Sequence, residues 1–272
     1  MTKVSVLIPS FGEKERLFKL IKKLKKCKEI REIIVVSPDK FVKKLKSKMV
    51  KVIIERKRKG KSAAINKGLK LINSEIILLL TSDIILEGSV SYLLKWFKKE
   101  NIGAVVGKIL ADKNGKKYWL SKVIWNLHSL VCEIEPKGTE IMAFKKIFNK
   151  IDETLDDEVF IEYMIRKKGY KIVYEPKCFG YTKSPNTLLY FFRQRERSFL
   201  SHLEIIKKYS FYPSTLNTTI LLKVIKKFFY TSNFKDIIVF FLVCLIEIIA
   251  RVSAIVKFIF SKYKYAWERE NF

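Results

Sequence analysis

Cysteine is scarce in this chain, and the few that occur exclude two classes of protein. Only four cysteines occur among 272 residues, at positions 27, 132, 178 and 244. They are far apart and form no Cys-x-x-Cys pair, so we expect neither a structural zinc site nor a disulfide framework, and a reducing compartment fits. The chain starts with the strand-like run VSVLIP, so we also expect no signal peptide.

Acidic residues are also few. The 27 Asp and Glu residues stand against 55 Lys and Arg, which gives a formal charge of +28 at pH 7. Such a balance favours polyanionic partners: nucleic acid, anionic lipid headgroups or phosphorylated substrates. No RNA-recognition signature, zinc finger or helix-turn-helix pattern is visible, so we expect no nucleic-acid partner. A lysine- and isoleucine-rich thermophilic composition is the alternative source of the charge.

Short apolar runs alternate with amphipathic helical patterns over residues 1–110. The runs predict strands at residues 4–8, 33–36, 51–54, 76–80 and 102–106. Leucines and isoleucines at helical spacing predict helices at residues 17–24, 62–72 and 90–97. Strands that are apolar throughout are buried on both sides, so the predicted fold class is α/β, with a mainly parallel sheet and helices on both faces.

Residues 111–150 are less regular. A helix is predicted over residues 143–148, after the turn at 136–138. A second helix opens at Asp156 and runs to about residue 168, with acidic residues at its start and basic ones before Gly169. A last strand is predicted at residues 171–174, ending at Pro176.

Composition changes after about residue 186. Residues 216–230 mix lysines with Leu, Ile, Val and Phe, which is typical of an interfacial amphipathic helix. Residues 237–260 are the most hydrophobic segment, and about 24 residues at a rise of ~1.5 Å span roughly 36 Å, enough for a bilayer core of about 30 Å. Within it Glu247 and Arg251 are spaced to pair on one helix face. We expect a spanning or deeply embedded helix; a buried helix of a soluble domain is the alternative.

Asp83 follows the predicted strand 76–80. Ligands of open α/β sheets bind outside the carboxyl ends of the strands, and a carboxylate there can hold a divalent cation against a phosphate. A helix N-cap is the alternative role. The basic loop 58–61 precedes a helix that starts near Ser62, whose free N–H groups suit an anion. A solvated basic loop is the alternative there.

Two further clusters carry charge that chemistry can use. Asp156, Asp157 and Glu158 are adjacent, and their mutual repulsion raises the pKa of at least one of them, which suits a general base. The alternative is that these acids only stabilise the start of a helix. The segment 193–197 is rich in arginine, which suits bidentate phosphate binding or a basic collar at a membrane.

These clusters, in this order, resemble the family 2 glycosyltransferases with the GT-A fold, over roughly residues 3–199. RKGKSAAINKGL is similar to the family's basic-Gly-Lys-x-x-Ala-x-Asn-x-Gly segment. TSDIIL aligns with its DxD metal motif, with Thr81 in place of the first acid. LDDEVFIEYMIRKKGY resembles the helix with the catalytic acid. QRERS matches QxxRW, with Ser198 in place of Trp.

The resemblance implies site residues and a cofactor. It favours Asp157 as the catalytic base and leaves Asp156 and Glu158 open. It implies that Asp83 binds Mg²⁺ or Mn²⁺. The residues that it implies for binding of the nucleotide-sugar are Pro9, Ser10, Glu13, Asp39, Lys59, Lys61, Asn66, Asp83, Gln194, Arg195 and Arg197.

The implied function is inverting transfer of a sugar from a nucleoside diphosphate sugar to a hydroxyl or phosphate of a lipid-linked acceptor. We expect a catalytic domain at residues 1–186, a connecting segment at 187–212 and a membrane-associated helical region at 213–272. Basic residues would hold the catalytic domain on the anionic cytoplasmic face of the cell membrane. The replaced acid and Trp motivate an alternative, a membrane-associated nucleotide-sugar-binding protein with a degenerate, inactive domain.

Overall fold

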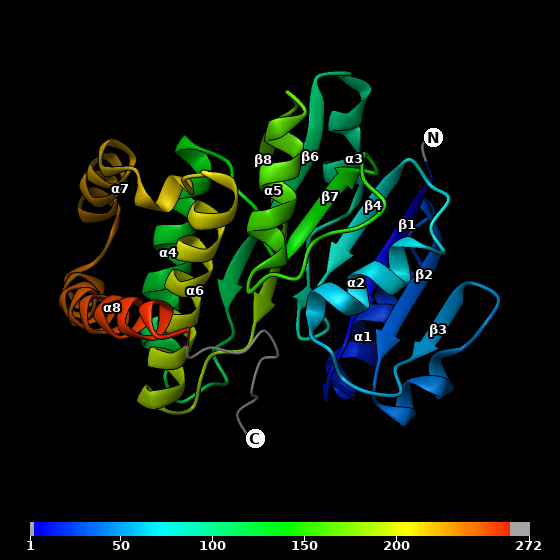
Figure 1. Cartoon of the computed structure of the whole chain (residues 1–272), viewed down its shortest axis with the longest axis horizontal. Helices are drawn as coiled ribbons and strands as arrows, with labels where there is room; N and C mark the ends of the chain where they lie inside the picture. The colour runs from blue at the N-terminus through cyan, green and yellow to red at the C-terminus, as the bar shows by residue number, and fades with distance from the viewer. Residues whose placement is uncertain (1–2, 262–272) are drawn as a thin grey trace.

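A single eight-stranded sheet forms the centre of the molecule in the computed structural model, which describes residues 3–261 (Figure 1). The spatial order of the strands is β3-β2-β1-β4-β7-β6-β8-β5. Their bounds are Val4–Pro9 (β1), Ile30–Ser37 (β2), Val50–Ile54 (β3), Ile76–Leu80 (β4), Ile85–Leu86 (β5), Ile102–Ala111 (β6), Ile141–Lys145 (β7) and Lys171–Thr182 (β8). The five strands predicted in the first 110 residues are all present.

The sheet is mixed. Strands β1 to β4 pair in parallel, as do β6 and β8, whereas β7 runs antiparallel between β4 and β6, and β5 is antiparallel to β8. Parallel β1, β2 and β4 therefore open their carboxyl ends at one edge, which is where a ligand crevice is expected. The predicted α/β fold is confirmed, and strands β1 to β4 are parallel as predicted. The antiparallel strands β7 and β5 were not predicted.

Helices cover both faces of the sheet, as predicted. On β1, Val4, Val6 and Ile8 pack with α1 (Glu15–Leu24) on one face, while Leu7 packs with α2 (Lys61–Leu69) on the other. This follows from the alternation of side chains along a strand. Helix α5 (Asp157–Lys167) shares the face of α2. The shorter elements α3 (Ser91–Leu94), η1 (Lys40–Leu45) and η2 (Lys95–Lys98) complete the opposite side.

The helix predicted over residues 143–148 is wrong. Residues Ile141–Lys145 form β7, which inserts between β4 and β6 and is buried over its first four residues. A short apolar run has no periodicity that separates a buried strand from a buried helix. Here the position between two strands with unpaired edges decides in favour of the strand.

Strand β8 continues past Pro176, where the sequence prediction ended it. Its pairing with β6 jumps from Gly107↔Glu175 to Lys108↔Phe179, so residues 176–178 bulge out of the ladder. A proline has no N–H to donate to a ladder and is tolerated at such a bulge. The strand therefore reaches Thr182, which brings its end beside β5 and the loop after β4.

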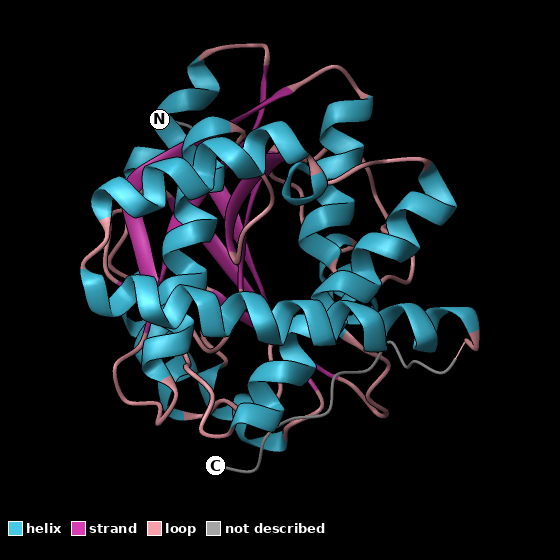
Figure 2. Ribbon diagram, turned by 90° about the vertical axis from the view of Figure 1, so that its left-hand side faces the viewer, coloured by secondary structure: helices cyan, strands magenta, loops and turns pink. Residues whose placement is uncertain are grey.

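A separate layer of helices stands beside the sheet, on the left of Figure 1 and in front of the strands in Figure 2. It consists of α4 (Tyr118–Ile134), α6 (Leu188–Tyr209), α7 (Thr218–Thr231) and α8 (Phe234–Ile259), with the short turn η3 (Ser214–Leu216) before α7. Helix α4 was not predicted, and the segment treated as a connection, 187–212, is mostly the 22-residue helix α6.

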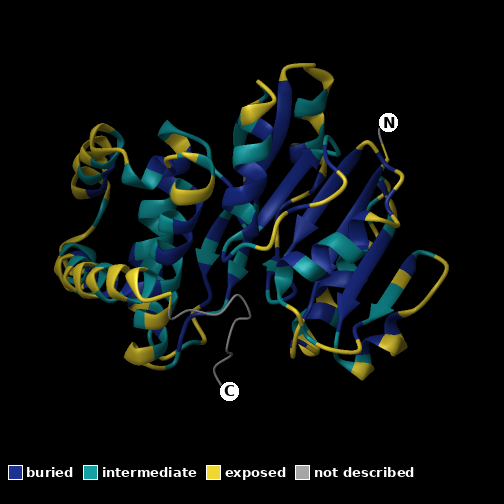
Figure 3. Ribbon diagram, in the orientation of Figure 1, coloured by how far each residue is buried: buried dark blue, intermediate teal, exposed yellow. Residues whose placement is uncertain are grey.

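Helix α8 packs on α6 and α4 and turns a hydrophobic face outward. It has 26 residues and is the only helix in the described part of the chain that is long and apolar enough to cross a membrane. Its outward side chains are exposed, among them Ile238, Phe241, Leu245 and Ile249 at 52–62%. Figure 3 shows this exposed side along α7 and α8. Residues 262–272 of the predicted membrane region lie outside the described residues.

Candidate functional site

A cavity of about 830 Å³ begins at the carboxyl ends of β1 and β4 and extends between α4, α6 and α8. It gathers most of the residues predicted for the site. Those that line it are Pro9, Ser10, Glu13, Lys61, Asp83, Asp156, Asp157, Glu158, Gln194, Arg195 and Arg197. Residues separated by more than 180 positions thus share one cavity, as the sequence clusters predicted.

Three predicted site residues do not line this cavity. Asn66 instead binds the backbone of Ile151 twice: its Nδ2 donates to the carbonyl and its Oδ1 accepts from the amide, both at 2.8 Å. Asp39 accepts from the backbone N–H of Gly12 at 2.5 Å and so fixes the turn after β1. Lys59 is exposed. Asn66 and Asp39 therefore support the loops that shape the site.

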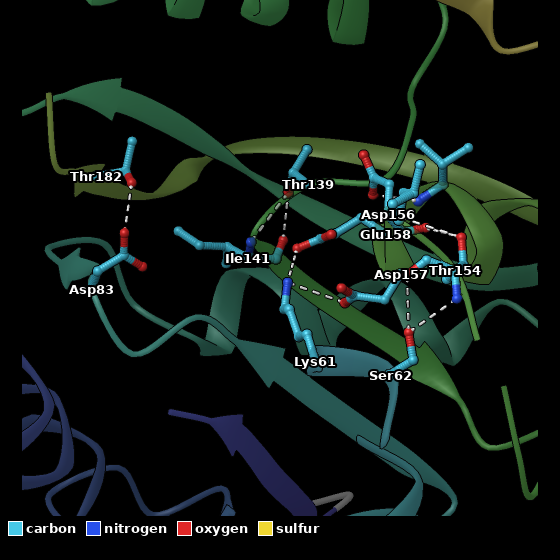
Figure 4. A network of polar contacts seen from close by, with 12 residues as sticks. Lys61, Ser62, Asp83, Thr139, Ile141, Thr154, Asp156, Asp157, Glu158 and Thr182 are labelled. Carbon is cyan, nitrogen blue, oxygen red and sulfur yellow. Dashed lines mark hydrogen bonds and ion pairs between the residues drawn. The ribbon is translucent and has the colours of Figure 1, made fainter. Parts of the chain in front are cut away.

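Lys61 lies between two carboxylates. Gly60 precedes it at φ 100°, a left-handed conformation that favours glycine, and so α2 starts with Lys61 directed across the cavity. The Lys61 Nζ lies 2.5 Å from Glu158 Oε1 and 3.1 Å from Asp157 Oδ2 (Figure 4). These two acids raise the pKa of Lys61, so the ammonium group stays charged.

The three adjacent acids differ in their surroundings. Asp156 caps α5 by accepting from the Val159 amide at 3.1 Å. Glu158 is held ionised by Lys61, which lowers its pKa. Asp157 is buried, with 4% of its side chain exposed, and burial together with the charge of Glu158 raises its pKa to about 7. A carboxylate that titrates near neutral pH suits a general base. The pKa of Asp156 is also raised to about 7, but its carboxylate caps the helix, so the geometry favours Asp157.

Asp83 is held at the end of β4 from two directions. Arg16 Nη1 donates to its backbone carbonyl at 2.8 Å, and Thr182 Oγ1 donates to Asp83 Oδ2 at 3.3 Å (Figure 4). The same Arg16 forms an ion pair with Asp112. The side chain of Asp83 therefore enters the cavity from a braced loop, and it is not a helix N-cap, because β5 follows it rather than a helix.

Glu140 is a second acid on this side that the sequence reasoning missed. Gly138 packs so closely on the Glu158 carbonyl that an added Cβ would lie 2.4 Å from it, and this approach places Glu140 in the cavity wall. Burial and the charges of Asp83 and Glu158 raise the pKa of Glu140 well above its usual value. Glu140 lies between the turn at 136–138 and the helix predicted over 143–148, and the sequence reasoning assigned it no role.

The donor set on this side fits a divalent cation only in part. Asp83 lines the cavity together with Glu140, whose Oε2 is buried and has no hydrogen-bond partner within residues 3–261. In that same range no group of three or more His, Cys, Asp or Glu side chains is arranged to hold a metal ion. Mg²⁺ is commonly bound through one or two carboxylates plus substrate phosphates and water. Asp83 and Glu140 fit that mode.

Helix α6 delivers the predicted arginine cluster to two different parts of the cavity. Arg197 Nη2 donates to the Leu155 carbonyl at 3.2 Å, and Asp156 and Asp157 lie near enough to act on its pKa, with burial the larger effect. Arg195 instead lies 3.5 Å from Glu247 of α8. Arg197 is therefore close to the acids of α5, whereas Arg195 belongs to the part of the cavity under α8.

That second part of the cavity is mainly apolar and was not predicted from the sequence. Its walls come from α4, α6, α7 and α8, with side chains such as Leu127, Phe191, Val224 and Phe240. The cavity therefore has a charged part beside the acids and an apolar part beneath α8.

Comparisons with known proteins agree with this geometry. Residues 5–174 match the family described as glycosyl transferase family 2. Among solved structures, the chain is similar to a mannosyltransferase, PcManGT from Pyrobaculum calidifontis, in complex with GDP-Man and Mn²⁺. The similarity covers 96% of this chain and 88% of that one at 13% identity, with a TM-score of 0.60, which shows a shared fold. Comparison with curated protein sequences gives no match.

Proposed function

The chain belongs to the family 2 glycosyltransferases, and we propose that it transfers a sugar with inversion from a nucleoside diphosphate sugar to a hydroxyl or phosphate of a lipid-linked acceptor. One observation carries the proposal: Asp157, with a pKa near 7, faces a cavity that also contains Asp83, Lys61 and Arg197. A base beside cationic side chains is the arrangement that a single displacement requires.

The donor is assigned to the part of the cavity at the ends of β1 and β4. Asp83 and Glu140 would hold a Mg²⁺ or Mn²⁺ ion, which would neutralise charge on the leaving diphosphate. Arg197 lies on the α6 side of the same space and can bind a phosphate oxygen. GDP-mannose is the first donor to test, because it is present in the complex of the similar mannosyltransferase.

Asp157 would take the proton from the acceptor as its oxygen attacks the anomeric carbon. Lys61 stays charged within 3.1 Å of Asp157, so it favours the ionised base without removing it from the cavity. A single displacement at the anomeric carbon needs one base and no covalent nucleophile, and it inverts the configuration.

The lipid-linked acceptor is supported by the helical layer. The apolar half of the cavity lies directly under α7 and α8. The exposed residues of α8 are largely apolar, whereas those of α7 mix lysines and threonines with Leu222, Phe229 and Tyr230. An acceptor with an apolar chain could therefore reach the base from a membrane that contacts these helices. The excess of basic residues suits the anionic cytoplasmic surface.

The ion pairs of α8 favour a helix that lies in the membrane interface over one that crosses the bilayer. Its polar side chains pair with the catalytic domain: Asp236 with Lys122 at 2.6 Å, and Lys257 with Glu196 at 2.6 Å. A crossing would break these pairs, whereas an in-plane position keeps them and buries the outward apolar face.

The test measures sugar transfer by the full chain in detergent or vesicles, with a panel of nucleoside diphosphate sugars and Mn²⁺. Asp83→Ala and Asp157→Asn should each abolish turnover, and Glu153→Gln, an exposed acid near α5, should not. Wild-type-like turnover in both site variants would contradict the assignment. Donor binding by calorimetry without any transfer or hydrolysis would instead support the degenerate binding protein, the alternative that Thr81 motivates.

A further inference from the structure

A cluster of cations lies in the cavity on the far side of the catalytic acids. Lys137, Arg195 and Arg251 all line it, at the junction of α4, α6 and α8. Glu247 is the acid among them, 3.5 Å from Arg195 and 3.5 Å from Arg251. One carboxylate is thus shared by two arginines in a partly buried space that Lys137 also lines, which leaves an excess of positive charge.

The other acids around this cluster are paired with other cations. Their ion pairs are Glu133 with Lys227 at 2.5 Å, Glu162 with Arg166 at 3.0 Å, and Glu196 with Lys257 at 2.6 Å. None of these pairs includes Lys137, Arg195 or Arg251. Because charges removed from water are costly unless they are balanced, an anion would complete this part of the cavity.

Both histidines of the chain lie in the same place. His128 and His202 line the cavity, and burial together with the charges of Lys137 and Arg195 lowers the pKa of each. For His202 the value is about 3, so the ring is neutral at pH 7. Its Nδ1 is buried and has no hydrogen-bond partner in the part of the chain that the structure describes. A neutral imidazole can donate one hydrogen bond to an anionic oxygen.

The walls next to the cluster are apolar. Val131, Phe191, Val224, Phe240 and Val243 line this end and belong to one hydrophobic cluster. The guanidinium of Arg251 lies 5.1 Å from the centre of the Phe199 ring, so an aromatic side chain also packs against the charged part. A ligand that fills the space must therefore carry an anion at one end and an apolar chain at the other.

We propose that this half of the cavity is a subsite for the phosphate of an amphiphilic acceptor, a phosphate ester on a long apolar chain. Arg195 and Arg251 bind the phosphate oxygens, His202 donates a further hydrogen bond, and the apolar walls hold the first part of the chain. The role as acceptor site rests on the proposed function, whereas the binding itself needs no sugar transfer. Arginine suits this task because its planar group binds phosphate with two parallel hydrogen bonds.

The experiment measures binding of farnesyl phosphate to the full chain in detergent, without donor or metal, by isothermal titration calorimetry. Farnesol and inorganic phosphate are the matched probes, since each has one half of the ligand. We expect farnesyl phosphate to bind at least about tenfold more tightly than either. A factor of ten in affinity corresponds to ~1.4 kcal/mol, and a charge-assisted hydrogen bond contributes more than that.

Substitutions distinguish a role of the two arginines in ligand binding from a role in stabilising the fold. Arg195→Gln and Arg251→Gln should each weaken farnesyl phosphate binding at least about tenfold. Glu247→Gln should strengthen it, because it removes the acid that competes for both arginines; a merely destabilised fold cannot bind more tightly. Arg193→Gln is the matched control, an exposed arginine on the same helix, and should change nothing.

Three outcomes would overturn the inference. If farnesol bound as tightly as farnesyl phosphate, the phosphate would contribute nothing to binding, and the cluster would not be an anion site. Equal binding of inorganic phosphate would assign the cluster to free phosphate. Full competition by phosphatidylglycerol would assign it to a resident membrane lipid.

Failure of the subsite is distinguishable from failure of the proposed function. Transfer of sugar to a neutral acceptor, without binding of farnesyl phosphate, would contradict only the subsite. Arginine-dependent binding without any transfer would contradict only the proposed function.

Discussion

The two halves of the cavity are built in different ways. The half at the ends of β1 and β4 is polar, and its acids and Lys61 come from a strand end and from two helix starts, each held by hydrogen bonds or ion pairs. The half under α8 is mainly apolar with a few half-buried cations, and its walls come from four helices. Short sequence motifs specify the first half, whereas only helix packing creates the second.

The largest expected effect is a loss of catalysis that is confined to the polar half of the cavity. Asp157→Asn should lower kcat for sugar transfer by about 10²- to 10⁴-fold, the range that a general base commonly contributes. Binding of the lipid phosphate in the apolar half should be unchanged, as calorimetry can check. A comparable loss of both would show that the two halves fold as one unit and would contradict the division.

A second prediction concerns pH, because turnover and the contribution of the base to stability should respond in opposite directions. Burial and the charge of Glu158 raise the pKa of Asp156 and Asp157 from 3.8 to about 7, against the attraction of Lys61, and Arg197 faces the same acids. Between pH 4 and 7 these two acids bind more protons in the folded state than in the unfolded state, so their contribution to the free energy of unfolding falls as pH rises, whereas His128 and His202, whose pKa values are lowered from 6.5, contribute in the opposite direction. The ionised base forms over the same interval, so kcat/KM rises.

Measurements between pH 5 and 8 avoid the titration of Glu158, whose pKa is lowered and whose stabilising ion pair is lost only at more acidic pH. We expect kcat/KM to fall about tenfold per pH unit below 7, while the Tm of the wild type rises relative to that of Asp157→Asn. The comparison isolates the acid, because both proteins contain His128 and His202. An identical pH dependence of Tm in both proteins would contradict the assigned titration.

A third prediction sharpens how the polar half is supported. Asn66→Ala removes two hydrogen bonds to the Ile151 backbone and should lower the free energy of unfolding by about 1–3 kcal/mol. The KM for the donor should change only slightly, because Asn66 does not line the cavity. Asn73→Ala, at an exposed position, is the control. Loss of donor binding at unchanged Tm would place Asn66 on the nucleotide, as the sequence predicted.

The smallest expected effect concerns the outer surface of the apolar half. Phe241→Ser removes one exposed apolar side chain from the outward face of α8 and should weaken binding to anionic vesicles by up to about tenfold, as measured by co-sedimentation. Leu71→Ser, an exposed apolar residue outside the helical layer, is the matched control. Equal loss in both variants would show that the membrane contacts another face.

The sequence predicted the polar half well because its signals are local. The carboxylate at the end of β4, the acids at the start of α5 and the basic loop before α2 each follow from a few neighbouring residues. The strand that was predicted as a helix lies where distant contacts decide: β7 is a strand because β4 and β6 flank it. Distant contacts also hold Asn66, which clamps Ile151, 85 positions away.

The chain by itself therefore determined the alternation of strands and helices and the order of the charged clusters, because side-chain periodicity and turn chemistry act over a few residues. Only the tertiary structure decided which acids have a pKa near 7, which part of the cavity Arg195 lines, and that two histidines and three cations lie beside apolar walls. Burial and pairing set these properties, and both depend on segments that meet only when the helical layer packs beside the sheet.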